Sequence, residues 1–257
     1  MQERQLSRMQ ACKILKCSRN SKYYHKLMPE KDNQIKQAIE KTIGYSRKGR
    51  MKVIRLIQKE HPQIGSSRIR RVYERYGFAL TKKLKRRIKD NPKNPIAIPL
   101  SGNIEWGMDF MSDALTDGRR IRTLNIVEHY NRECLGICVG HSITAKIVID
   151  FLEQRIELYG KPISIRTDNG PEFTSKAFQL WLHNNKIAWG KIEKGCPQQN
   201  AIVERFNRTY REDVLDAYLF HHTTQAQQIT DRWIEEYNTK RPHQSLNQLT
   251  PKEYAAA

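Results

Sequence analysis

The sequence has no long apolar run and few cysteines. Apolar stretches such as residues 147–149 are far shorter than the roughly 20 residues that a membrane helix needs. No apolar segment near the start indicates a secretory signal. The five cysteines lack the spacing of a disulfide or zinc framework, and no pair of histidines stands at ligand spacing beside them. We therefore expect free thiols in a reducing cytoplasm, without membrane association or bound zinc.

Acidic residues are scarce in the first 100 positions, which we call the leader. The leader has 27 Lys and Arg residues against 7 Asp and Glu residues, a balance of +20, whereas the balance of residues 101–257 is −1. All of the net charge of +19 therefore lies in the leader. This division predicts one region that binds a polyanion and a second region with another task. Although only 38% of the residues are hydrophobic, 257 residues suffice for a core in two or three domains.

The leader is predicted to contain two helix-turn-helix units. Two short helices within residues 6–26 form the first unit, which we place at 1–30. In the second unit, at 31–88, a helix with apolar residues at 51–57 ends near Pro62. Ser66 or Ser67 then caps a helix that stops at Gly77. The second helix of such a motif enters the major groove of DNA; the alternative is an ordinary solvated basic helix.

Cations of the second unit are the predicted DNA contacts. Residues 82–89 hold six cations, which would bind a phosphate backbone with strong salt dependence; the alternative is a solvated tail. Prolines that follow predict an extended linker at 89–103. The predicted contacts in the leader are Arg68, Arg70, Arg71, Arg75, Lys82, Lys83, Lys85, Arg86 and Arg87.

The remainder of the chain predicts an α/β fold with a mixed sheet. Three antiparallel strands come first, and helices alternate with strands after them. A hairpin turn is expected at Asp117-Gly118. The expected strands are 105–114, 119–127, 134–139, 162–167 and 188–192, and the expected helices are 143–158, 175–185, 198–219 and 224–237.

Three carboxylates stand where phosphodiester chemistry would need them. That chemistry uses two divalent cations about 4 Å apart, and Mg²⁺ prefers oxygen ligands. Asp109 lies within an apolar strand, where an ionised group is unusual without a partner or a metal. Asp168 lies at the carboxyl end of a strand, where ligands bind in open α/β sheets. Glu204 lies on one helix face with three further polar residues, Asn200, Arg208 and Arg211.

Each carboxylate has a simpler structural explanation. Asp109 could be a surface residue of a half-exposed strand, and Asp113 is a rival on the same strand face. Asp168 could shape the turn that Asn169 and Gly170 continue. Glu204 could form an i,i+4 salt bridge on a solvated helix. Glu172 could contact the site, but we expect that it simply precedes the next helix.

The spacing of the three carboxylates favours the functional interpretation. The order Asp, Asp, 35 residues and Glu resembles that of the DDE transposases of the retroviral-integrase superfamily, and more narrowly that of the OrfB-type transposases of bacterial insertion sequences. The resemblance covers nearly the whole chain. Its matching stretches are 106–110, 167–173, 200–207 and 237–246, and Arg211 matches a cation seven positions after the glutamate.

The resemblance implies an RNase H-like catalytic core at 104–222, followed by a C-terminal helix and tail at 223–257. Asp109, Asp168 and Glu204 would be the catalytic residues and the ligands of Mg²⁺, for which Mn²⁺ would substitute. Water and then a DNA 3′-hydroxyl would attack phosphodiesters at the terminal inverted repeats, without a covalent protein intermediate. Arg208 would contact DNA, as would Arg211 unless it positions the helix.

The resemblance also implies partners. These are double-stranded DNA, from the element ends and the target, and further copies of the chain in a homo-oligomer on DNA. Such a protein would be nucleoid-associated. The family often makes its transposase from two overlapping reading frames. The chain could therefore act alone or together with a partner protein from the upstream frame. Asn200 would contact DNA or the site.

Two departures from the family pattern leave alternatives open. The family often has Asp-x-x-Ser-Arg after its second strand, where this chain has Glu128 to Arg132, so any role of Glu128 is open. The His-His-Cys-Cys zinc module of retroviral integrases is missing from the leader. Rival functions are a non-catalytic DNA-binding regulator, a structure-selective nuclease of the same fold, and a tyrosine or serine recombinase.

Overall fold

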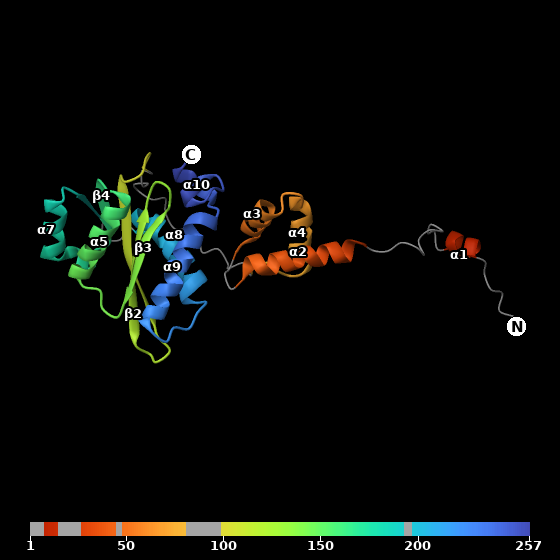
Figure 1. The fold of residues 1–257 in the computed structure, drawn as a ribbon, viewed down its shortest axis with the longest axis horizontal. Helices are drawn as coiled ribbons and strands as arrows, with labels where there is room; N and C mark the ends of the chain where they lie inside the picture. The colour runs from red at the N-terminus through yellow and green to blue at the C-terminus, as the bar shows by residue number, and fades with distance from the viewer. Residues whose placement is uncertain (1–7, 15–26, 45–47, 81–98, 193–196) are drawn as a thin grey trace.

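The computed structural model describes residues 8–14, 27–44, 48–80, 99–192 and 197–257. Residues 105–191 contain a five-stranded mixed sheet with the strand order β3-β2-β1-β4-β5. The pairs β1–β2 and β2–β3 are antiparallel, and the pairs β1–β4 and β4–β5 are parallel (Figure 1). The strands are β1 (Glu105–Ala114), β2 (Arg120–Glu128), β3 (Cys134–Gly140), β4 (Ser164–Thr167) and β5 (Ala188–Lys191).

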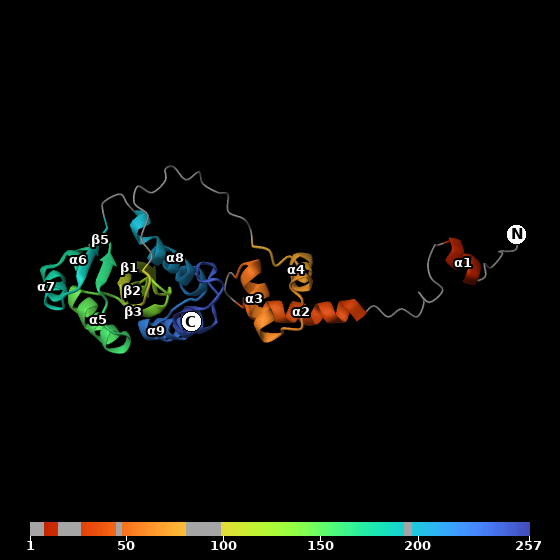
Figure 2. The same ribbon diagram turned by 90° about the horizontal axis from the view of Figure 1, so that it is seen from above.

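Helices cover both faces of this sheet (Figure 2). One face packs on α5 (Ala145–Tyr159), α6 (Pro171–Thr174) and α7 (Lys176–Asn184), in a core that includes Trp106 and Met108. The other face packs on α8 (Ala201–Tyr210) and α9 (Thr223–Lys240), in a core that includes Val203 and Phe206. Both faces of β1 are therefore covered.

The chain after β5 differs from the single helix predicted at 198–219. A 3₁₀ turn, η2 (Pro197–Asn200), precedes α8, and a π-helical segment, η3 (Arg211–Leu215), follows it. The wider η3 segment carries buried Asp213, which forms an ion pair with Arg241 beyond α9. Tertiary pairing thus accompanies the departure from regular α-helix, which local periodicity does not reveal. A 3₁₀ turn, η4 (Gln244–Leu246), and a short helix, α10 (Pro251–Ala255), complete the chain.

A separate core holds three helices of the leader together. They are α2 (Leu27–Ile43), α3 (Arg50–Glu60) and α4 (Ser66–Arg75), and Ile39, Ile57 and Val72 are fully buried among them. The predicted helices of 51–57 and 66–77 correspond to α3 and α4, whereas α2 was not predicted. In the 6–26 region only α1 (Arg8–Ile14) lies within the described residues. No helix in the described ranges is long and apolar enough to cross a membrane.

Candidate active site

The strand register brings Asp109 and Asp168 together. In the parallel pair β1–β4, Gly107 lies opposite Arg166, and Asp109 and Asp168 follow two residues beyond this last pair. The two carboxylates are close enough for the charge of Asp168 to raise the pKa of Asp109. Neighbouring strands lie about 4.8 Å apart, and alternate residues share a face. The sequence alone could not establish this register, because β4 is only four residues long.

The carboxylate of Asp109 points toward α8 and accepts two hydrogen bonds. Its Oδ1 accepts from the backbone N–H of Phe110 at 2.9 Å, and its Oδ2 accepts from the side-chain amide of Asn207 at 2.8 Å. Asp109 faces away from Met108, which belongs to the core on the other face of the sheet. Helix α8 packs on the face that Asp109 occupies, so Asp109 is half-buried beside Asn207.

Asn207 is a further residue of this site, which its type and position in the sequence did not reveal. It is buried, and its Oδ1 accepts from the side-chain amide of Asn125 on β2 at 2.7 Å. Asn125 lies directly opposite Asp109 in the antiparallel register. The relay from Asn125 through Asn207 to Asp109 fixes the orientation of the Asn207 amide. The spacing from Glu204, three residues earlier on α8, was a signal that both side chains share a helix face.

A glycine allows α8 to lie close to β1. A Cβ atom on Gly107 would overlap Cγ2 of Val203 and Nε2 of His129, closer than packed atoms tolerate. Val203 immediately precedes Glu204, so this close approach sets the position of the Glu204 backbone. Glu204 itself lies in the first turn of α8, and its side chain is exposed.

Asp168 begins the turn that leads from β4 into α6. Its Oδ1 accepts a hydrogen bond from the backbone N–H of Gly170 at 3.0 Å, as expected for a turn-forming aspartate. This structural role does not remove Asp168 from the site, because its second oxygen has no hydrogen bond within the described chain. Turn formation and proximity to Asp109 therefore coexist in one residue.

The three carboxylates interact electrostatically. Burial, followed by the negative charges of Asp168 and Glu204, raises the pKa of Asp109 to about 6, against the hydrogen bonds from Phe110 and Asn207. Such an arrangement disfavours the ionised form of Asp109 unless a positive charge is nearby. Within the described ranges, no three acidic, histidine or cysteine side chains are already close enough to hold a metal ion.

The three polar residues predicted beside Glu204 have different environments. Asn200 is buried, and its Oδ1 has no hydrogen-bond partner within the described chain. Arg208 is exposed. The guanidinium of Arg211 donates to the backbone carbonyl of Ser112 at 2.8 Å, which joins the start of η3 to β1. Arg211 is therefore in a position to fix the end of α8.

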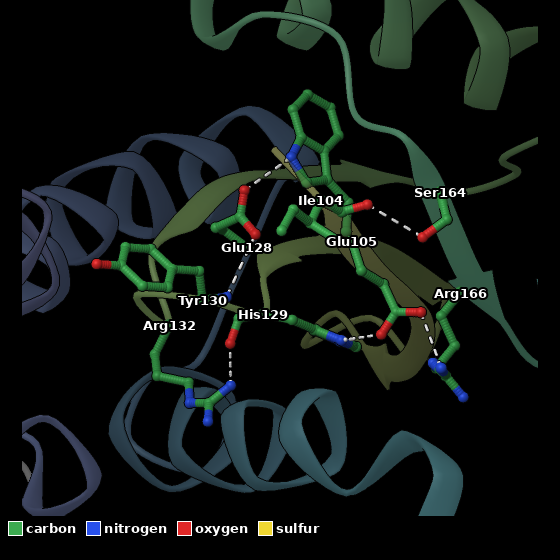
Figure 3. Close-up of polar contacts among 9 residues, drawn as sticks. Ile104, Glu105, Glu128, His129, Tyr130, Arg132, Ser164 and Arg166 are labelled. Atoms are coloured by element: carbon green, nitrogen blue, oxygen red, sulfur yellow. Dashed lines mark hydrogen bonds and ion pairs between the residues drawn. The ribbon is translucent and has the colours of Figure 1, made fainter. Parts of the chain in front are cut away.

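Buried ionic groups support the other end of β1 (Figure 3). Glu105 accepts from Nδ1 of His129 and from the guanidinium of Arg166, each at 2.8 Å. Burial alone would raise the pKa of Glu105, but these hydrogen bonds lower it to about 2. Glu128 accepts from the indole N–H of Trp106 at 3.1 Å and from backbone amides. Glu128, whose role was open, thus anchors β1.

The arginines of α4 are largely engaged in ion pairs. Asp32 on α2 is buried, and the guanidinium groups of Arg71, Arg68 and Arg75 lie 2.7, 3.6 and 3.6 Å from it. Arg70 pairs with Glu74 on its own helix at 3.2 Å. These predicted DNA contacts therefore also hold α4 against α2. The other predicted contacts of the leader, namely Lys82, Lys83, Lys85, Arg86 and Arg87, lie outside the described residues.

Comparison with known proteins gives consistent matches. Two models of the integrase core domain match residues 102–197 and 185–251. Over 253 residues, 98% of this chain, the sequence is 32% identical to the insertion element IS407 uncharacterized 31.7 kDa protein of Burkholderia multivorans, of which 91% is covered. Over the same length it is 34% identical to the insertion element IS476 uncharacterized 39.2 kDa protein of Xanthomonas euvesicatoria, of which 73% is covered.

The fold is similar to that of the HTLV-2 integrase catalytic core domain, whose structure was solved in complex with magnesium in a trimeric form. The TM-score is 0.50 at 21% identity, and the match covers 61% of this chain and 98% of the other. This likeness confirms the predicted RNase H-like α/β fold of the sheet and its helices.

Proposed function

We propose that this chain, which belongs to the insertion-sequence DDE transposases of the integrase superfamily, cleaves and joins DNA with Asp109, Asp168 and Glu204 as its catalytic carboxylates. The observation that carries this assignment is the raised pKa of Asp109 on β1, which burial causes first and the charges of Asp168, after β4, and Glu204, on α8, increase. Ionisation of Asp109 therefore has a free-energy cost that a nearby cation would offset. Perturbed groups of this kind are typical of functional sites.

A hard divalent cation fits this donor set. Carboxylate oxygens are the preferred ligands of Mg²⁺, and Mn²⁺ accepts the same ligands. We propose that Asp109, Asp168 and Glu204 hold two such ions. Both are Mg²⁺ under physiological conditions, and Mn²⁺ can replace them. Bound ions would activate the attacking oxygen and stabilise the leaving oxygen of the phosphodiester.

The chain's own side chains orient this site. Asn207 fixes one oxygen of Asp109, and the N–H of Phe110 fixes the other, so each oxygen keeps a free lone pair in a defined direction. Gly170 does the same for one oxygen of Asp168. Through its bond to Ser112, Arg211 holds the end of the helix that carries Glu204. Such preorganisation reduces the reorganisation that the reaction would otherwise require.

The basic leader is proposed to bind the DNA. The short connection 61–65 between the helices α3 and α4 supports a helix-turn-helix in this region. Despite their ion pairs with Asp32, the side chains of Arg71 and Arg75 are 49% and 64% exposed. Both guanidinium groups can therefore reach a phosphate while they keep their ion pairs with Asp32 of α2. The run at 82–89 and the residues Asn200 and Arg208 stay predictions as further contacts.

The division of the chain and its assembly complete the proposal. We propose helix-turn-helix units at 1–30 and 31–88, a linker at 89–103, a catalytic core at 104–222 and a C-terminal segment at 223–257. Double-stranded DNA, at the element ends and the target, is the proposed partner and substrate, and the chain is proposed to act on it as a homo-oligomer. An upstream-frame partner protein stays an open alternative.

The decisive experiment measures cleavage and strand transfer on the element's own ends with Mg²⁺ or Mn²⁺. Asp109→Asn, Asp168→Asn and Glu204→Gln should each abolish both reactions while DNA binding is retained, because each removes one negative ligand. Asp117→Asn, at an exposed hairpin acid paired with Arg119, is the matched control and should stay active. Full activity in any one of the three variants would refute the role of that residue.

A further inference from the structure

We propose that Glu172 is a positioning residue of this site, which Arg122 orients so that its second carboxylate oxygen accepts a hydrogen bond from the hydration shell of a cation held at Asp168. This inference rests on the proposed function, because it takes Asp168 to be a cation ligand. It goes beyond that function by adding an ionised group to the site from the start of α6.

The ion pair between Arg122 and Glu172 connects β2 to α6. Arg122 donates to Oε1 of Glu172, and the side chains are 31% and 13% exposed. The guanidinium of Arg122 also lies over the ring of Phe110, 4.2 Å from its centroid. Phe110 follows Asp109 directly and stacks on Phe173, with the ring centroids 5.1 Å apart. This cluster thus joins the strand that carries Asp109 to the helix that follows Asp168.

The second oxygen of Glu172 lies near Asp168. A Cβ atom placed on Gly170 would be 3.2 Å from Oδ1 of Asp168 and 3.4 Å from Oε2 of Glu172, so both oxygens lie close to the same backbone position. Oε2 is buried, and it has no hydrogen-bond partner within the described chain. A buried acceptor without a donor is costly, and a donor near Asp168 would remove this cost.

Arg122 keeps this carboxylate both fixed and ionised. Burial would raise the pKa of Glu172, but the hydrogen bond from Arg122 lowers it below its usual value. Because Mg²⁺ usually keeps several water ligands, an ionised acceptor beside Asp168 would strengthen cation binding without direct coordination. Groups that act in this way are commonly worth about 10-fold or more in metal affinity.

The test is Mn²⁺ binding to the full-length protein without DNA, followed by the electron paramagnetic resonance signal of free Mn²⁺. Glu172→Gln should weaken Mn²⁺ binding by about 10-fold. Glu74→Gln is the matched control, since Glu74 is also paired with an arginine but lies on α4; it should bind Mn²⁺ as the wild type does. Unchanged affinity in Glu172→Gln would overturn the inference.

Two further variants distinguish a role in cation binding from a purely structural role of the ion pair. Arg122→Gln removes the cation that orients and ionises Glu172, so it should also weaken Mn²⁺ binding, by no more than Glu172→Gln does. Weakening in both variants that accompanies an equal loss of melting temperature in the absence of cations would mean that the pair is merely structural, and it would overturn the inference. Asp168→Asn should lose Mn²⁺ binding. If Asp168→Asn binds normally, the proposed function itself fails, whereas loss in Asp168→Asn with normal binding in Glu172→Gln refutes only the role of Glu172.

Discussion

Replacing Asp109 with asparagine should change the pH dependence of stability. The pKa of Asp109 is about 6 in the folded protein, against an ordinary value of 3.8. Between these two values the folded state holds more protons than the unfolded state, so the wild type loses stability as the pH rises through this window. The full effect is at most about 3 kcal/mol. Asparagine does not titrate, so the variant avoids this loss.

The asparagine variant also loses a hydrogen bond. The carboxylate of Asp109 accepts from both Phe110 and Asn207, whereas a carboxamide can accept from only one of them and turns its NH₂ group toward the other donor. Asn207 cannot simply reverse its amide, because its Oδ1 already accepts from Asn125. This mismatch costs about 1–3 kcal/mol at every pH.

These two effects predict a crossover. In Asp109→Asn, the free energy of unfolding should be about 1–3 kcal/mol lower than in the wild type near pH 4. It should equal or exceed the wild-type value at pH 7.5, because at that pH Asp109 is ionised and the wild type has lost the full stability described above. Urea unfolding followed by circular dichroism at pH 4, 5, 6 and 7.5, with divalent cations removed by EDTA, measures the difference. A difference that stays constant with pH, or that moves the other way, would refute the reasoning.

Three other substitutions test the packing of α8 on β1, the buried ion pair of Asp213 and the DNA contacts of α4. Gly107→Ala should lower the free energy of unfolding by about 2–3 kcal/mol in urea titrations, because its methyl group overlaps Val203 of α8 as well as His129 and forces α8 outward; wild-type stability would contradict this packing. Arg241→Met should lower the melting temperature strongly, since it leaves Asp213 buried without its partner, at about 3–5 kcal/mol; Arg241→Lys is the control that keeps the charge. Asp32→Asn should steepen the salt dependence of DNA binding by about one charge, because it frees cations on α4; an unchanged slope would argue against α4 as a DNA contact.

The strands of the catalytic region could be predicted from the sequence to within a few residues. Apolar alternation at 106, 108 and 110 identifies β1, and the Asp117-Gly118 turn identifies its hairpin partner, because side chains alternate between the faces of a strand. Helix α2 was missed. Its side that faces α3 and α4 includes Asp32, a charged residue that is buried only because arginines of another helix surround it. No pattern within 27–43 contains that information.

Residue type and spacing along the chain are sufficient to predict Asp109, Asp168 and Glu204 as the catalytic carboxylates, because the chemistry demands carboxylates and the resemblance gives their order. The roles of Asn207 and Glu172 follow only from tertiary contacts. Asn207 meets Asn125 across 82 positions, and Glu172 meets Arg122 across 50. Contacts between residues so far apart leave no local pattern in the sequence. We therefore expected only that Glu172 precedes a helix.

The sequence by itself determined the chemistry of this protein, since the kinds of side chain and the charge of each region are properties of the chain alone. A basic leader and three spaced carboxylates already indicated DNA and divalent cations. Only the tertiary structure decided which groups are desolvated and which are paired. The pKa of Asp109 and the pairing of the α4 arginines with Asp32 depend on packing between distant segments, because burial and Coulomb interactions depend on separation in space.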